Sequence, residues 1–167
     1  ISEEKGLEII EQTSNLLFKR NIQHEFIIAG DNKDKRFKKY LNKIYLLTKS
    51  NKRIKFIGSI PEQDKSNFFN SIDMLILPST NSFEAFGIVQ IESMLHGVPV
   101  IASNLKGVRM PIKCTGNGYI FETGNTIMFI DSILKTINNK SLTKLKIQRN
   151  CLDNFSEDKF DKQSLLL

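Results

Sequence analysis

The chain has 167 residues, of which 40% are hydrophobic and 25% are charged, a composition that excludes a disordered chain, a collagen and a disulfide scaffold. The length suits a single domain with a sizeable core, and no apolar run approaches the roughly 20 residues that span a bilayer. The net charge is +6, but residues 31–55 hold ten Lys or Arg against two Asp, so the remainder is slightly acidic.

The hydrophobic pattern predicts helices and strands in alternation. A helical pattern over 7–18 comes first, then a buried strand over 24–30 that ends in a glycine turn, and then a helix through the basic segment. Further strands are expected at 54–58, 74–78, 98–103 and within 116–124. Further helices are expected after Pro61 and at 87–96, 125–137, 141–151 and 156–166.

The basic segment from Asp31 to Lys55 has two interpretations. Phe37, Leu41 and Ile44 recur through it at helical spacing, which favours the solvated face of an amphipathic helix. A positive stripe can also meet the phosphates of a nucleic acid or an anionic membrane surface. Few aromatic residues lie among the charges, whereas a platform for stacked bases needs several, so we expect no nucleic-acid partner and leave a peripheral membrane contact open.

Short β-rich runs that alternate with helical segments indicate parallel βαβ units. We therefore predict an α/β fold with a doubly wound parallel sheet. In such sheets ligands bind beyond the carboxyl ends of the strands, where loops lead into helix N-termini. The loop over 79–86, between the strand at 74–78 and the helix at 87–96, is therefore the most informative segment.

Two glutamates and a glycine around this loop are candidate binding residues. Gly87 would lie at the start of the helix, where unpaired backbone N–H groups suit a phosphate and a glycine lets a ligand approach the backbone. Glu92 lies in a largely apolar helix, so its carboxylate needs hydrogen-bond partners, which the hydroxyls of a ribose would supply. Glu84 stands in the loop and can point into the crevice beside the phosphate position.

Several of these residues also have a purely structural interpretation. Glu84 can be a capping acid and Glu92 a residue at the edge of a helix surface, and each of these interpretations is favoured when the residue is considered alone. His24 and His96 are expected to be structural. The chain has no Asp-x-Asp sequence that would hold a divalent cation on a diphosphate, so we expect neither a metal site nor a cofactor.

The cysteines and the first residues bear on location. Cys114 and Cys151 form no Cys-x-x-Cys pair and have no histidine at metal-ligand spacing, which argues against a zinc site and suits a reducing cytosol. The first ten residues show no export signal, so we expect a cytoplasmic location, with contact at the inner face of the membrane left open. The chain does not begin with methionine and is expected to start inside a longer protein.

Taken together, the segments along the chain resemble a known family. Glu84, seven further residues and Glu92, with HGVPVIAS after them, resemble the E-x7-E motif of glycosyltransferase family 4 and the strand that follows it. Glu4-Lys5-Gly6, IIAG, FIGSIP and DMLILPS resemble further segments of that family. The resemblance implies one half of a GT-B fold, namely the Rossmann-like C-terminal domain that binds a nucleotide sugar.

The resemblance also implies roles for the residues that match the motifs. Lys5 corresponds to a lysine at the donor diphosphate, Glu84 to an acid near the donor sugar, and Glu92 to the acid that holds the ribose hydroxyls. Lys5 and Glu84 would thus be the catalytic residues. The family's Gly-Gly-x-x-Glu stretch is altered here to Gly107-Val108-Arg109-Met110, with the second glycine and the glutamate lost.

The remaining donor contacts implied by the resemblance come from two turns. Phe86, Gly87 and Ile88 would bind the phosphate or sugar of the donor, the last two through their backbone N–H groups. Ile57 and Gly58 would border the base.

These expectations define one preferred function and two alternatives. Residues 1–155 would form the nucleotide-sugar-binding domain and 156–167 a C-terminal helix, with the N-terminal acceptor domain absent from this chain. The preferred function is donor binding in a retaining glycosyltransferase that moves a hexosyl group from a nucleoside diphosphate sugar to a glycan or lipid acceptor. The alternatives are a nucleotide-sugar epimerase with a GT-B fold and a non-catalytic basic module for nucleic acid or membrane.

Overall fold

The strands of this protein pair in parallel throughout the part of the chain that the computed structural model describes, residues 2–31, 38–81 and 86–156. Strand β1 (Phe26–Ala29) pairs with β2 (Ile54–Gly58). A second sheet has the order β3-β4-β5, formed by Leu75–Leu77, Val100–Ser103 and Gly118–Phe121. These pairings and the intervening helices confirm the expected α/β class, although the strands are divided between two sheets.

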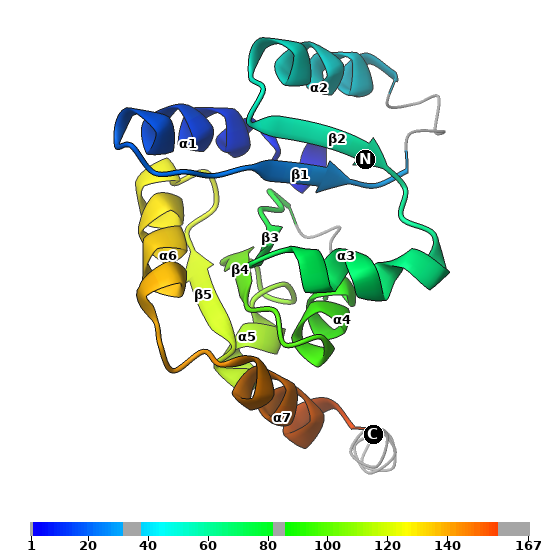
Figure 1. The fold of residues 1–167 in the computed structure, drawn as a ribbon, viewed down its shortest axis with the longest axis vertical. Helices are drawn as coiled ribbons and strands as arrows, with labels where there is room; N and C mark the ends of the chain where they lie inside the picture. The colour runs from blue at the N-terminus through cyan, green and yellow to red at the C-terminus, as the bar shows by residue number, and fades with distance from the viewer. Residues whose placement is uncertain (1, 32–37, 82–85, 157–167) are drawn as a thin grey trace.

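Helices precede, connect and follow the strands in the order expected from the sequence (Figure 1). Their bounds are η1 Glu3–Lys5, α1 Glu8–Lys19, α2 Lys38–Ser50, η3 Glu62–Asp64, α3 Lys65–Ser71, α4 Val89–Leu95, α5 Met110–Thr115, α6 Thr126–Asn138 and α7 Lys144–Phe155. The short helix α5 was not expected. The helix expected at 156–166 lies outside the described residues from its second position onward, so its prediction is not tested.

Side-chain caps fix the start of two of the C-terminal helices. The side chain of Asn125 accepts a hydrogen bond from the backbone N–H of Met128 at 3.0 Å, which begins α6. Thr143 accepts from the N–H of Lys146 at 3.4 Å in the same way at the start of α7. These caps explain why α6 and α7 begin close to where the pattern places them.

Helices α1 and α2 lie side by side next to the β1–β2 sheet (Figure 1). The amide of Asn51, just after α2, donates to the hydroxyl of Ser14 in α1 at 3.0 Å, and both side chains are buried or nearly so. The same hydroxyl lies 2.8 Å from Nε2 of His24, whose Nδ1 lies 2.8 Å from the carbonyl of Ile22. His24 is therefore a structural residue, as expected.

The buried apolar residues form two clusters, and both include residues of the three-stranded sheet. The first joins α1, α2, β1 and β2 to α6 and includes Leu17, Ile54 and Phe129. The second packs α4, α5 and α7 against the three-stranded sheet around Met94 and Ile147. Because α6 also packs on β5, it connects the two halves of the molecule. None of the helices within the described ranges is long and apolar enough to cross a bilayer.

Candidate functional site

The N-terminal segment is held against the carboxyl end of β3. The backbone N–H of Thr80 donates to the carbonyl of Glu4 at 2.8 Å. Gly6 has φ of 64°, and a Cβ there would collide with the carbonyl oxygen of Pro78, so only glycine allows this close approach. Lys5, which precedes this glycine, is thereby fixed at the edge of the sheet where α/β proteins bind ligands.

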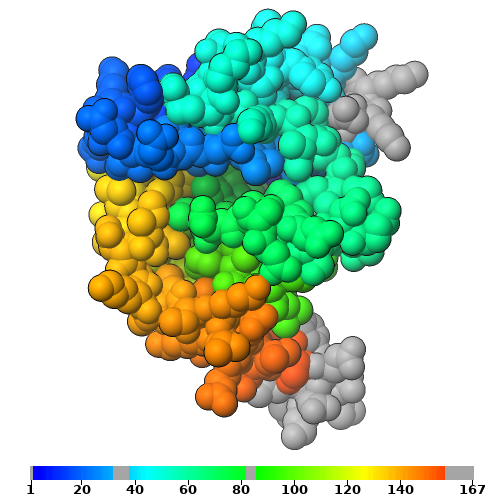
Figure 2. Space-filling view, in the orientation of Figure 1, coloured from blue at the N-terminus to red at the C-terminus, as the bar shows by residue number. Residues whose placement is uncertain are grey.

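A cavity of about 1170 Å³ opens at this edge and extends between the two sheets. Lys5, Gly30, Pro78, Lys65 and Glu92 line it at the carboxyl ends of the strands. In the space-filling view a recess lies between the blue segment of α1 and β1 and the green segment below it (Figure 2). The cavity therefore contains two of the residues predicted from the sequence, Lys5 and Glu92.

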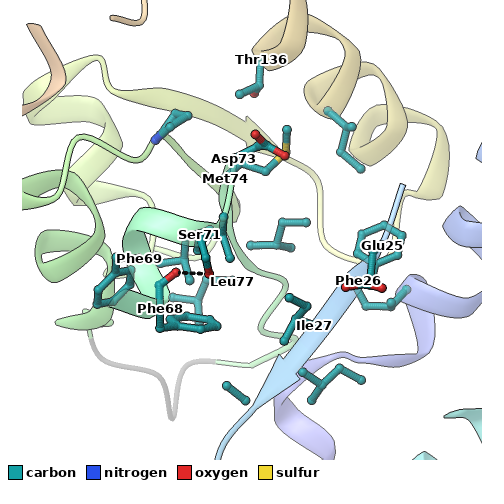
Figure 3. Close-up of a pocket in the computed structure, with 18 of the residues that line it drawn as sticks. Glu25, Phe26, Ile27, Phe68, Phe69, Ser71, Asp73, Met74, Leu77 and Thr136 are labelled. Atoms are coloured by element: carbon teal, nitrogen blue, oxygen red, sulfur yellow. Dashed lines mark hydrogen bonds between the residues drawn. The ribbon is translucent and has the colours of Figure 1, made fainter. Parts of the chain in front are cut away.

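The deeper walls of this cavity are largely apolar. Figure 3 shows Phe26 and Ile27 of β1 along one wall, with Phe68 of α3 and Leu77 of β3 across from them. Acidic side chains lie toward the other end of the strands, where Glu25 precedes β1. Of the described residues that line the cavity, the lysines, Lys5 and Lys65, lie at the end that holds Glu92, so this is the end suited to a phosphate.

Glu92 has a protein partner that the sequence did not reveal. Nζ of Lys65 in α3 lies 2.9 Å from Oε1 of Glu92 and 2.9 Å from Oε2 of Glu62. Hydrogen bonds to Glu62 and then to Glu92 raise the pKa of Lys65 above its ordinary value, so Lys65 stays charged. Oε2 of Glu92 has no hydrogen-bond partner among the described residues and remains able to accept one.

The turn before α4 is fixed by a tertiary contact of its glycine. Gly87 is buried, with φ of 73°, and a Cβ there would come within 2.6 Å of Cδ2 of Leu77. A left-handed turn that packs on β3 therefore requires this glycine. Its binding of a ligand through the backbone stays a prediction. The helix itself begins at Val89, with Ile88 as the residue before it.

The backbone N–H groups at this turn nonetheless keep their capacity to donate. Neither Gly87 nor Ile88 donates its N–H to any described residue, which is the ordinary state of the first groups of a helix. Gln90 holds the turn in place from beneath, because its buried amide nitrogen donates to the carbonyls of Phe86 at 2.9 Å and Val108 at 2.8 Å. Together these two hydrogen bonds join the turn before α4 to the loop before α5.

The other expected site residues lie apart from the cavity lining. Phe86 packs edge-on against Phe155 of α7, with ring centroids 5.9 Å apart. Ile57 is 49% exposed and lines a shallow neighbouring pocket with Phe68, a residue that also lines the main cavity. The carbonyl of Gly58 accepts from the N–H of Gly30 at 2.8 Å, which joins the ends of β1 and β2. Glu84 lies outside the described residues.

Two features of the site were missed by reasoning from the sequence. Lys65 precedes an apolar helix face and looks like an ordinary surface lysine until the fold brings Glu92 to it. At the carboxyl ends of β4 and β5, the amide of Asn104 donates to Glu122 at 2.7 Å, and Arg109 donates to the carbonyl oxygen of the Asn104 side chain at 2.9 Å. No cluster of three His, Cys, Asp or Glu suited to a metal occurs within the described ranges.

His96 and the two cysteines lie in different surroundings. Nδ1 of His96 lies 2.8 Å from the carbonyl of Glu92, and its ring stacks on Phe69 at 5.0 Å between centroids. Cys114 is exposed and Cys151 buried, and both are free thiols. The contacts of His96 are therefore with the protein's own backbone and core.

Comparison with known proteins matches this chain to one family over most of its length. The sequence profile of the family described as "Glycosyl transferases group 1" matches residues 1–153. A phosphatidyl-myo-inositol mannosyltransferase of Mycobacterium leprae is 29% identical over 89 residues, covering 53% of this chain and 24% of the relative. The curated relatives extend well beyond the matched region, since the chain spans 24%, 28% and 37% of three of them.

Solved structures show the same fold. The crystal structure of Anabaena Alr3699/HepE in complex with UDP-glucose has a TM-score of 0.80 and 23% identity, and the match covers 98% of this chain and 44% of that one. The C-terminal domain of a glycosyl transferase group 1 family protein from Francisella tularensis has a TM-score of 0.67 and 24% identity, covering 92% of this chain and 78% of that one. At these identities the likeness bears on the fold alone.

Proposed function

The chain belongs to the group 1 glycosyl transferases, and we propose that it is the donor-binding half of a retaining enzyme of this family. In this proposal the enzyme moves a hexosyl group from a nucleoside diphosphate sugar to a glycan or lipid acceptor. The GT-B fold places the donor in one Rossmann-like half and the acceptor largely in the other, so acceptor recognition would lie outside this chain.

The observation that carries the proposal is the meeting of Lys5 and Glu92 in one cavity. These residues are far apart in the sequence, and both line the cavity at the carboxyl ends of the strands. A cation and a carboxylate in one cleft match two polar parts of a nucleoside diphosphate, because a diphosphate needs positive donors and a ribose offers hydroxyl donors. An ordinary structural role for either residue does not require this common location.

The positive groups have a chemical role in transfer as well as in binding. When the sugar leaves a nucleoside diphosphate, negative charge grows on the oxygen of the departing phosphate. Donors fixed near that oxygen stabilise the transition state more than the ground state and so raise the rate. We assign this role to the ammonium group of Lys5 and to the unused N–H groups of Gly87 and Ile88. Glu84 remains our candidate for the acid near the donor sugar.

The carboxylate of Glu92 would bind the ribose through Oε2. Its other oxygen is occupied by Lys65 at 2.9 Å, which fixes the carboxylate on the cavity wall. A carboxylate held in this way before the ligand arrives loses less conformational entropy on binding. Ile57 and Gly58, at the end of β2, are proposed to border the base, since the pocket beside Ile57 shares Phe68 with the main cavity.

Relatives with related folds support a nucleotide-sugar donor. The Anabaena protein was solved with UDP and with UDP-glucose, and the Mycobacterium leprae relative is named a mannosyltransferase, which is consistent with a hexosyl donor. The family match favours transfer over epimerisation and over a purely binding role.

A thermal-shift screen against nucleoside diphosphates tests the proposal. A ligand at a hundred times its Kd stabilises the folded state by about 2.7 kcal/mol, which raises the Tm measurably in a domain of this size. We expect at least one nucleoside diphosphate to raise the Tm while the matching free base does not. A screen in which no nucleoside diphosphate shifts the Tm of the folded chain would contradict the proposal.

A further inference from the structure

Helix α2 exposes a leucine at the centre of a basic surface. Leu46 is 66% exposed, although leucines on a helix of this kind ordinarily face the core. It follows Lys39 by two helical turns and precedes Lys49 by about one turn, so all three lie on one side of the helix, with Lys38 at its edge. We call these four residues the basic face of α2.

The charge on this face is not neutralised by any residue that the structure describes. Between Lys38 and Lys55 the sequence holds seven Lys or Arg and no acidic residue. Lys43 pairs with Glu8 of α1 at 3.2 Å and Lys55 pairs with Glu25 at 2.5 Å. By contrast, Lys38, Lys39 and Lys49 form no ion pair with any described residue. Three lysines without an ion pair to a described residue therefore lie on the same helix as Leu46.

A second exposed apolar side chain adjoins α2 at the end of α1. Phe18 is 58% exposed, and the guanidinium carbon of Arg53 lies 4.1 Å from the centre of its ring. Lys19 and Arg20 follow Phe18 and are also exposed. Figure 2 shows α2, in cyan, on the outer surface of the molecule beside the blue α1. An exposed apolar side chain with basic residues near it therefore occurs on each of these two helices.

We propose that the basic face of α2 binds an anionic phospholipid membrane surface. Negative headgroups complement the unpaired lysines, and each lysine near such a surface strengthens binding about fivefold. The exposed Leu46 can enter the boundary between headgroups and acyl chains, where burial of apolar area adds to the electrostatic attraction. A nucleic-acid backbone would use the lysines but would gain nothing from an isolated leucine among them.

This contact is independent of the proposed donor site. None of Lys38, Lys39, Leu46 and Lys49 lines the cavity that holds Lys5 and Glu92. The face would hold the protein at the membrane surface while the cavity is free to bind its ligand. A failure of membrane binding would therefore leave the proposed donor function untouched. A failure of nucleotide binding would likewise leave the proposed membrane contact untouched.

Vesicle flotation of the full chain tests the inference. The probes are vesicles of phosphatidylcholine alone and vesicles of phosphatidylcholine with phosphatidylglycerol in equal amounts. We expect binding to the anionic vesicles only, with an affinity that falls as salt is added because the charges are screened. The triple variant Lys38→Gln, Lys39→Gln, Lys49→Gln is expected to bind about 100-fold more weakly, at about fivefold for each lysine.

Matched variants separate this face from net charge in general. Lys113→Gln, Lys140→Gln and Lys146→Gln together remove the same charge from exposed positions elsewhere and are expected to leave binding nearly unchanged. Leu46→Ser is expected to weaken binding about fivefold. Leu145→Ser, at a leucine of α7 that is 79% exposed, is expected to leave it unchanged.

Three outcomes would overturn the inference. The first is equal binding to both kinds of vesicle or to neither. The second is an equal loss in the two triple variants, which would show that only total charge matters. The third is tighter binding to a short RNA than to anionic vesicles, with no effect of Leu46→Ser on either ligand. Unchanged Tm values in all variants establish that each remains folded.

Discussion

The ammonium group of Lys65 lies 2.9 Å from Oε1 of Glu92, and this ion pair joins α3 to α4 on the wall of the cavity. Both side chains are about one-third exposed, so the pair is accessible to a ligand in the cavity. Lys65 is therefore placed to set the orientation of the carboxylate that we assign to the ribose.

Lys65→Met should weaken nucleotide binding without abolishing it. Glu92 then loses the partner that orients it and must order its carboxylate when the ligand binds, which we expect to cost about fivefold in affinity. The double variant with Glu92→Gln should bind no more weakly than Glu92→Gln alone, because residues in direct contact are not additive. Calorimetric titration of the single and double variants measures this coupling.

Glu62→Gln is the control for Lys65→Met. This variant removes the charge of Glu62, the other partner of Lys65, and leaves the bond between Lys65 and Glu92 in place. The side chain of Glu62 is 83% exposed. We expect no change in affinity. Additive losses in the double variant, or an equal loss in Glu62→Gln, would mean that Lys65 does not act through Glu92.

Gly6→Ala should displace Lys5. Gly6 has φ of 64°, and a Cβ would meet the carbonyl of Pro78, so the N-terminal segment must move away from β3. Gly124→Ala is the matched control, since Gly124 has φ of 76° but open space around the Cβ position. We expect Gly124→Ala to lower the free energy of unfolding by about 1–2 kcal/mol. Gly6→Ala should lower the free energy of unfolding further and also weaken nucleotide binding. Denaturant titration and calorimetric titration measure the two effects. Equal effects of Gly6→Ala and Gly124→Ala on both quantities would show that Gly6 does not position Lys5.

Much of the fold could be predicted because its signals are local. The period of the apolar residues and the turns marked by glycine give β1, β2 and β4 close to their observed bounds. Helix α5 was missed because it has only six residues, too few for a helical period to be recognised. The division into two sheets depends on contacts between distant segments.

The site could be predicted only in part, because some of its contacts join segments that are distant in the sequence. The resemblance of short motifs indicated Lys5 and Glu92, which the fold brings to one cavity. Lys65 could not be found from its neighbours in sequence, because its partner lies on another helix. The packing of Gly87 on Leu77 could not be predicted either, since it is a tertiary contact that leaves no pattern in the chain.

The two cysteines should react at very different rates with a thiol reagent. Burial raises the pKa of the Cys151 thiol to about 11, so at neutral pH it is both protonated and inaccessible. Cys114 is exposed. We expect one thiol to react quickly in the folded chain and the second only on unfolding, with Cys114→Ser abolishing the fast phase. Rapid modification of both thiols in the folded state would contradict the buried position of Cys151.

The titration of Lys65 and Tyr40 should lower the free energy of unfolding at alkaline pH and leave it nearly unchanged around neutrality. The pKa of Lys65 is raised from 10.5 by its pairs with Glu62 and Glu92, so their stabilising effect is complete below that pH and is lost as the pH rises through the raised value. Burial and the nearby Glu8 raise the pKa of Tyr40 from 10.0, so above that pH the unfolded chain ionises while the folded chain does not.

Denaturant titrations at increasing pH measure this effect. The free energy of unfolding should decline above about pH 10, and Tyr40→Phe should reduce the slope of that decline. A free energy that stays constant or rises through this range would show that Tyr40 and Lys65 lack the surroundings described above.

The central claim is tested most directly by calorimetric titration of Glu92→Gln with the nucleoside diphosphate that stabilises the wild-type chain most and with its 2′,3′-dideoxy analogue. We predict that Glu92→Gln binds the ribose nucleotide about 10- to 100-fold more weakly than wild type does, the loss of one or more charge-assisted hydrogen bonds. For the dideoxy analogue the two proteins should bind alike, and Glu25→Gln, which changes another carboxylate of the same cavity, should bind both ligands as wild type does. Equal affinities of Glu92→Gln and wild type for the ribose nucleotide, or an equal loss with the dideoxy analogue, would contradict the assignment of this cavity to a nucleotide-sugar donor.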